Sequence, residues 1–195
     1  MFDLNNNYFY FLFRLIPKPF ETIEEVKKRE KGMKFAFYSL FLFSALAMTN
    51  MMLYHLEGIY FDTPPPFVLI PWEWTWLTSF FLMIPIALLG AILFAGIVQL
   101  ISRRFGGKGT FEDQFALFLF AYPLSFIILH MVKLIGFIIT RESIGGIFLF
   151  TFVILGFFIT TIVVKIEQNM NWMPTILISI LGYGLVAIFS MTYIR

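Results

Sequence analysis

The chain has 195 residues, of which 59% are hydrophobic, 20% are aromatic and only 13% are charged. A soluble core of this size cannot bury so much apolar surface, so the composition excludes an ordinary soluble domain and indicates a membrane protein. The formal net charge of +2 is too small to indicate a nucleic-acid partner. Because the chain has no cysteine, it has no disulfide, no thiolate metal site and no cysteine nucleophile.

Residues 1–32 are predicted to form a cytosolic and interfacial N-terminal segment. The aromatic stretch Tyr8 to Ile16 is too short to span a bilayer and is followed by proline, so it is predicted to lie in the membrane interface. The stretch Phe20 to Lys31 has acids early and bases late, which suits the helix dipole and predicts a short cytosolic helix. Met1 to Asn7 carries no base, so no cleavable signal is expected.

Five apolar blocks follow, and they predict an all-α bundle of five transmembrane helices within residues 33–195. The predicted spans cover residues 33–54, 77–101, 114–139, 144–165 and 174–194. The one long connection, His55 to Thr75, has no Lys or Arg but contains three consecutive prolines and two tryptophans, which is typical of a stiff loop returning through an aromatic belt. Pro85 and Pro123 are expected to kink the second and third spans.

The Lys and Arg residues predict the orientation of these spans. Eleven of them lie before the first span, between the second and third spans, or at the start of the connection between the fourth and fifth. Only Arg141 and Arg195 lie on the opposite side. By the positive-inside rule the N-terminus is cytosolic and the C-terminus is outside.

The most distinctive polar segment is the connection between the second and third spans, where three bases surround a group of glycines. The candidate lipid-binding or partner-binding residues are Arg103, Arg104, Gly106, Gly107, Lys108, Gly109 and Phe111. Backbone N–H groups of a glycine-rich turn, the start of the third span and nearby bases together suit the phosphate of a lipid head group. The plainer alternative is a tight turn that carries positive-inside charges.

A second group of candidates lies inside the third predicted span. His130 and Lys133 are one helical turn apart, and Tyr122 precedes Pro123. An ionisable side chain within the membrane is a functional candidate, although Lys133 is close enough to the outer end to reach the interface. No acid lies at a matching depth, so the sequence does not favour a proton relay.

Enzyme motifs are absent. The sequence has no H-E-x-x-H, no G-x-S-x-G and no paired intramembrane carboxylates, so neither an enzyme nor a cofactor is predicted. His55, Glu57 and Asp62 are metal-ligand types on the outer side, but a solvated loop is the favoured interpretation and no metal site is predicted.

Three motifs carry a family resemblance: Pro-Lys-Pro-Phe at 17–20, Gly-Gly-Lys-Gly-Thr-Phe at 106–111, and Tyr122-Pro123. Within five predicted spans, they resemble the prokaryotic branch of the Yip family, named for Ypt-interacting proteins. The resemblance implies five spans and a cytosolic N-terminus. Eukaryotic members are associated with Rab-type GTPases and membrane trafficking, but the Asp-Leu-Tyr-Gly-Pro motif of that branch is absent, which weighs against a Rab-type partner.

These observations favour a non-enzymatic membrane scaffold with a cytosolic platform for a protein or an anionic lipid. The alternative is a small transporter with a midplane cavity near His130, Ser125, Gln99 and Lys133, because transporters line such pathways with polar groups. The short connections favour a prokaryotic cell membrane. A homo-oligomer is compatible with the sequence, which does not specify an oligomeric state.

Overall fold

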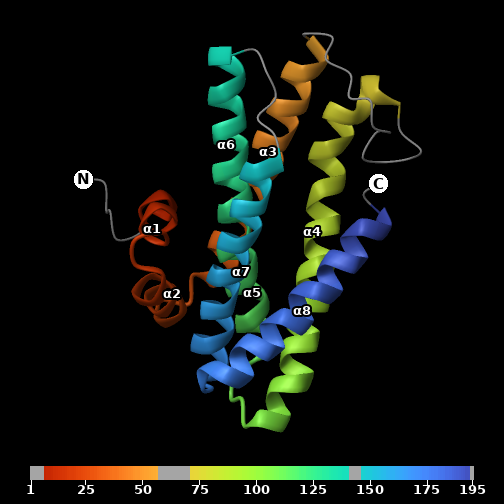
Figure 1. Ribbon diagram of the computed structural model, residues 1–195. Coiled ribbons are helices and arrows are strands. Elements are labelled where there is room, and N and C mark those ends of the chain that lie inside the picture. Colours follow the sequence, from red (N-terminus) through yellow and green to blue (C-terminus); the bar gives the residue numbers. More distant parts are fainter. Residues whose placement is uncertain (1–6, 57–70, 141–145, 194–195) are drawn as a thin grey trace.

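The computed structural model describes residues 7–56, 71–140 and 146–193, and these residues are almost entirely helical (Figure 1). In chain order the elements are α1 (Tyr8–Arg14), α2 (Pro19–Lys28), α3 (Gly32–Leu56), α4 (Trp72–Ser102), the 3-10 turn η2 (Arg103–Phe105), α5 (Phe111–Ala121), α6 (Pro123–Thr140), α7 (Gly146–Gln168) and α8 (Trp172–Tyr193). The predicted all-α architecture is confirmed for the described residues. Most of the outer connection, residues 57–70, and the turn at 141–145 lie outside them.

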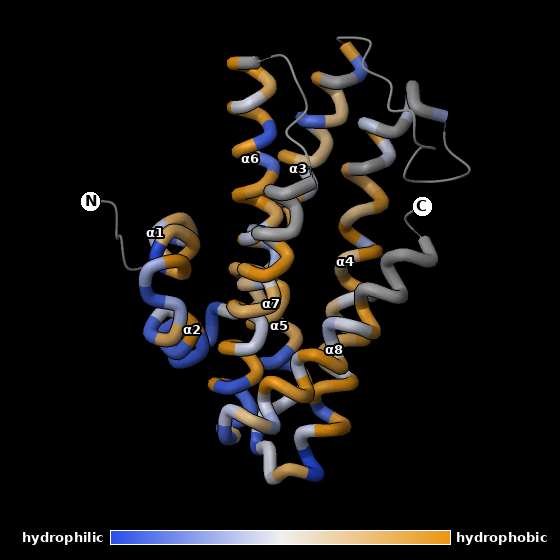
Figure 2. The backbone as a smooth tube through the Cα atoms, in the orientation of Figure 1, coloured by the Kyte–Doolittle hydropathy of each residue, from blue (hydrophilic) through white to orange (hydrophobic). Residues whose placement is uncertain are grey.

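Three stretches of the described residues are long and apolar enough to cross a bilayer: Gly32–Leu53, Phe80–Phe105 and Phe111–Ile139. Helix α8 adds a shorter apolar stretch, Trp172–Val186. Figure 2 shows hydrophobic residues along most of α4, whereas hydrophilic residues gather at α2 and beside the α4–α5 connection. The protein is therefore a polytopic integral membrane protein.

The third predicted span is two helices in the structure. Helix α5 ends at Ala121 and α6 begins at Pro123, with Tyr122 between them. The proline ring removes a backbone N–H, so the hydrogen-bond ladder is interrupted here, and the last bond before the break runs from Tyr122 N to Phe118 O at 2.8 Å. Helix α4, in contrast, continues through Pro85.

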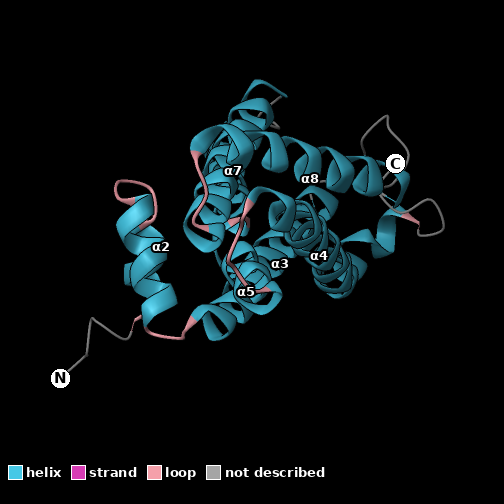
Figure 3. Ribbon diagram, turned by 90° about the horizontal axis from the view of Figure 1, so that it is seen from below, coloured by secondary structure: helices cyan, strands magenta, loops and turns pink. Residues whose placement is uncertain are grey.

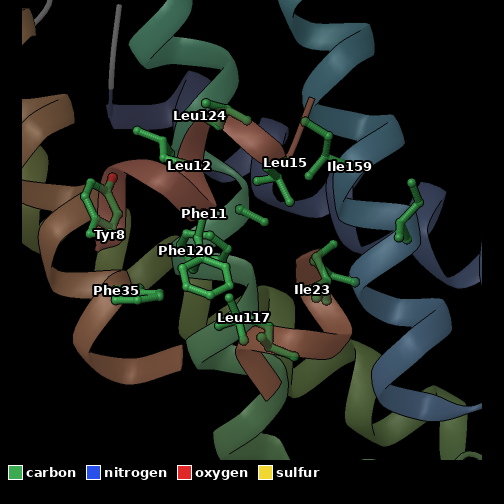
Figure 4. Packing of buried hydrophobic residues seen from close by; sticks show 14 of the residues in the cluster. Tyr8, Phe11, Leu12, Leu15, Ile23, Phe35, Leu117, Phe120, Leu124 and Ile159 are labelled. Atoms are coloured by element: carbon green, nitrogen blue, oxygen red, sulfur yellow. The ribbon is translucent and has the colours of Figure 1, made fainter. Parts of the chain in front are cut away.

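Helices α1 and α2 form a hairpin that packs against the flank of the bundle (Figures 1 and 3). Figure 3 shows α2 lengthwise in a view where α4 is seen nearly end on, so α2 runs across the bundle axis. Phe11, Leu15, Ile23 and Val26 are fully buried against α5 and α7, and Figure 4 shows their neighbours converging on Phe120. The N-terminal segment is thus packed into the hydrophobic core of the protein.

An ion-pair cluster closes this hairpin. The guanidinium of Arg14 lies 3.1 Å from Glu21 and 2.5 Å from Glu25, so α1 is tied to α2. Hydrogen bonding to Arg14 and the nearby charge of Lys18 hold the pKa of the Glu21 carboxyl below its ordinary value. Glu21 is therefore ionised at neutral pH, and its charge and that of Glu25 lie beside the Arg14 guanidinium.

Helix α8 crosses α4 at close range (Figure 1). A Cβ atom on Gly182 would lie 2.9 Å from the ring of Phe94, whereas Gly184, two residues on, has open space around it. Small residues at helix crossings let the two backbones approach. Gly182 therefore allows the close packing of α8 against α4.

Candidate functional site

The glycine loop, residues 103–110, connects α4 to α5 at one end of the bundle. Gly106 adopts the left-handed conformation, with φ of +78°, which reverses the chain after η2. Thr110 then caps α5, because its side-chain oxygen accepts a hydrogen bond from Asp113 N at 3.1 Å. This geometry fixes both ends of the loop.

Gln168, the last residue of α7, holds the loop from inside. Its side chain is fully buried, and its Oε1 atom accepts hydrogen bonds from Ser102 Oγ at 2.9 Å and from Gly109 N at 3.2 Å. Its Nε2 atom donates to Gln99 Oε1 at 3.2 Å, and Gln99 in turn donates to Gly109 O at 2.9 Å. A buried polar network of this kind gives the loop a single arrangement, because each unsatisfied group would be costly.

The backbone N–H groups of the loop donate to acceptors within the protein. The pairs are Gly107 N to Ser102 O (2.8 Å), Lys108 N to Gln168 O (3.1 Å), Gly109 N to Gln168 Oε1 (3.2 Å) and Thr110 N to Glu167 Oε1 (2.9 Å). These N–H groups are therefore occupied within the protein, and phosphate binding by the loop stays a prediction that depends on its basic side chains. The acceptors come from α7 and from the end of α4, which the local sequence pattern does not reveal.

Two of the glycines are required by close packing. A Cβ atom on Gly107 would lie 2.8 Å from both Gln168 Oε1 and Ser102 Cβ. A Cβ atom on Gly109 would lie 2.7 Å from both Gln168 Nε2 and the backbone oxygen of Glu167. Real Cβ atoms essentially never approach so closely, so the loop is glycine-rich in order to lie against the end of α7.

The basic side chains of the loop, in contrast, face outward. Arg103, Arg104 and Lys108 are exposed, and among the described residues none of them has an ion-pair partner. Phe105 is 56% exposed and Phe111 is 39% exposed. We call these five residues the basic platform: exposed cations without ion pairs among the described residues, and exposed aromatic rings, in the glycine loop and at the start of α5.

Glu167 links this loop to the N-terminal hairpin. Its side chain is only 1% exposed, its Oε1 atom accepts from Thr110 N, and its Oε2 atom lies 2.7 Å from Lys27 Nζ on α2. The predicted spans left Glu167 and Gln168 in the connection between the fourth and fifth spans, and the sequence pattern assigned them no role. A polar pair at the end of an apolar helix looks the same in sequence whether it is solvated or buried.

The intramembrane candidates are not gathered into one site. Asn50 on α3 donates to the backbone oxygen of His130 at 3.1 Å, and its amide nitrogen lies 3.5 Å from His130 Nδ1. Lys133 lies one turn further along α6. Tyr122 stacks on Phe118, with ring centroids 4.8 Å apart. Each polar group thus has its own environment, and the sequence pattern did not single out Asn50.

The residues of the predicted transporter cavity are also separate. Gln99 belongs to the network under the glycine loop, whereas Ser125 donates to Tyr122 O at 3.1 Å. A cavity that the described residues form between α1, α3 and α6 is lined only by apolar side chains and contains none of these four residues. No group of three metal-ligand residues occurs among the described residues, and Glu57 and Asp62 lie outside them.

A family model described as the Yip1 domain matches residues 13–194. The chain belongs to the Yip1-domain family. The match runs from α1 to the end of α8, and it confirms the resemblance to the Yip family, although not to a particular branch of it, that was drawn from the 17–20, 106–111 and Tyr122-Pro123 motifs. Comparison with curated proteins and with solved structures gave no match. The Yip1-domain assignment agrees with the membrane-spanning helices, and both identify a polytopic membrane protein.

Proposed function

We propose that this Yip1-domain protein is a non-enzymatic membrane scaffold whose basic platform binds the head groups of anionic phospholipids. The observation that carries the proposal is the contrast at the glycine loop. The backbone N–H groups of residues 107–110 donate to Ser102, Gln168 and Glu167, whereas the three cations of the loop are exposed and form no ion pair with the described residues. Exposed cations at the end of an apolar helix lie where they can bind the phosphate oxygens of lipid head groups at the membrane surface.

The proposed topology has five spans with the N-terminus and the platform in the cytosol. Helices α7 and α8 lie at the positions of the fourth and fifth predicted spans, which supports this number. Eleven Lys and Arg residues on the platform side against two on the other support the orientation. The short connections favour a prokaryotic cell membrane. Phe105 and Phe111 then lie at the depth where aromatic rings contact both head groups and chains.

The proposal is tested by lipid retention. The protein is purified in neutral detergent, incubated with equal amounts of phosphatidylglycerol and phosphatidylcholine, isolated again, and its retained lipids are quantified. The triple variant Arg103→Gln, Arg104→Gln and Lys108→Gln is expected to retain roughly tenfold less phosphatidylglycerol, since each base near a charged surface contributes about 1 kcal/mol before screening.

The control is Arg103→Lys with Arg104→Lys, which keeps every charge and is expected to retain phosphatidylglycerol as the parent does. Equal retention by the parent and the triple Gln variant would contradict lipid binding at the platform. A protein that copurifies with the parent and is lost in the triple variant would instead identify the platform as a protein-binding surface.

A further inference from the structure

A second feature lies away from the platform, on the flank of the bundle between α1, α3 and α6. It is a cavity of about 260 Å³ whose lining side chains are all Phe, Leu, Ile or Met. Its lining residues include Phe9 and Phe13 from α1, Leu46 from α3, and Ile128, Met131 and Ile135 from α6. We call it the apolar niche.

The apolar niche lies at membrane depth. Two of its walls belong to the stretches Gly32–Leu53 and Phe111–Ile139, which are long and apolar enough to cross a bilayer. Ile128 lies roughly 5 Å from the middle of the stretch Phe111–Ile139 at 1.5 Å per residue, which places it inside a hydrocarbon core about 30 Å thick. The niche therefore lies at the depth expected for the lipid chains.

The hairpin keeps its charges away from the niche. Arg14 is the one charged residue of α1, and its guanidinium is paired with Glu21 and Glu25 on α2. The other face of α1 presents Phe9 and Phe13, which are 51% and 63% exposed. Helix α1 thus supplies an apolar floor for the niche.

The lining and the rim of the niche favour an apolar occupant from the lipid. Water is disfavoured there because the lining residues offer side chains that form no hydrogen bonds. Its rim residues Met131 and Ile135 are exposed, and the same apolar surface continues along α6 to Ile138 and Ile139. The niche is therefore continuous with the surface that α6 presents to lipid.

We propose that the apolar niche is a binding site for one acyl chain of a membrane phospholipid, held between the aromatic side chains of α1 and the α3–α6 pair. Burial of a methylene group contributes about 0.8 kcal/mol when the group leaves water, and less when it leaves the lipid phase. Contacts with the rigid aromatic rings of α1 therefore decide whether the acyl chain prefers the niche to the surrounding lipid. The site uses none of the platform residues, so it stands or falls independently of the proposed function.

The test uses a phosphatidylcholine that carries a diazirine midway along one acyl chain. The protein is reconstituted in vesicles of this lipid, irradiated, and the adducts are mapped by mass spectrometry. Adducts at Leu46, Ile128 and Met131 are expected to exceed those at Leu100, which is 73% exposed on α4 and lies on an open surface.

Two variants that fill the niche, Ile128→Trp and Leu46→Trp, are expected to lower the niche adducts roughly tenfold by displacing methylene groups. The matched control is Ile92→Trp, on the exposed surface of α4, which is expected to leave them unchanged. Two variants are used because one of them could misfold. The comparison between the niche residues and Leu100 in the parent protein needs no variant.

Niche adducts no more frequent than those at Leu100 would overturn the proposal, as would adducts that persist in both filled variants. Crosslinks that join the niche to a second copy of the chain, or to residues 1–6 of the same chain, would also overturn it, because they would show another occupant.

Discussion

Gly109→Val is expected to lower the free energy of unfolding by about 3 kcal/mol, because the side chain must displace either Gln168 or the backbone of α7. A Cβ atom at this position would lie 2.7 Å from both Gln168 Nε2 and Glu167 O. Moving Gln168 would also leave Gly109 N without its acceptor and would remove the shorter of the two hydrogen bonds that Ser102 Oγ forms. The measurement is the midpoint of unfolding by sodium dodecyl sulfate in mixed micelles.

The matched control is Gly106→Asn in the same loop. Gly106 has open space around it, and its left-handed conformation is one that asparagine tolerates, so a change of less than about 1 kcal/mol is expected. If Gly109→Val were as stable as the parent, the loop would not be seated against α7 as the structure has it.

Lys27→Met is expected to detach the N-terminal hairpin and to destabilise the protein by about 3 kcal/mol. The substitution removes the cation 2.7 Å from Glu167 Oε2 and leaves a carboxylate that is only 1% exposed without a charge partner. Limited proteolysis of α1 and α2, together with the same unfolding assay, measures the effect. Lys28→Met is the control, because that neighbouring side chain is exposed.

A second substitution separates the charge from the packing. Adding Glu167→Gln to Lys27→Met removes the unpaired charge but keeps an oxygen that accepts from Thr110 N. The double variant is therefore expected to be more stable than Lys27→Met alone, with part of the protease resistance restored. A double variant that is less stable than Lys27→Met would show that the charge of Glu167 is not what the cation balances.

The sequence predicted where the helices lie because long apolar blocks in a membrane have few alternatives. Helices α3, α4, α7 and α8 agree with predicted spans to within a few residues, apart from the start of α4. The chemistry of Pro123 predicted a disturbance in the third span, and the structure has a break there. Local pattern was sufficient for these features, since hydropathy and proline act over a few residues.

Local pattern was not sufficient for the site. Gln168 meets Ser102 across 66 residues, Glu167 meets Thr110 across 57, and Asn50 meets His130 across 80. Such pairs depend on how the helices pack, which a single sequence does not display. For this reason the glycines of the loop were assigned to phosphate binding, whereas in the structure they allow contact with α7.

The docking of the N-terminal hairpin was missed for a related reason. The aromatic stretch that forms α1 suits a lipid interface and a protein groove equally well in composition. Only the packing of Phe11 and Leu15 against α5 and α7 distinguishes the two, together with the neutralisation of Arg14 by α2. The exposed Phe9 and Phe13 show that α1 in fact serves both surfaces.

The lipid-binding role of the basic platform is tested most directly by a photo-reactive amino acid in place of Phe105, between Arg104 and the turn at Gly106, in native membranes. The proposal predicts an adduct with an anionic phospholipid that disappears when Arg103, Arg104 and Lys108 are changed to glutamine and persists when both arginines are changed to lysine. No lipid adduct, or one that is unchanged after the three charges are removed, would contradict it.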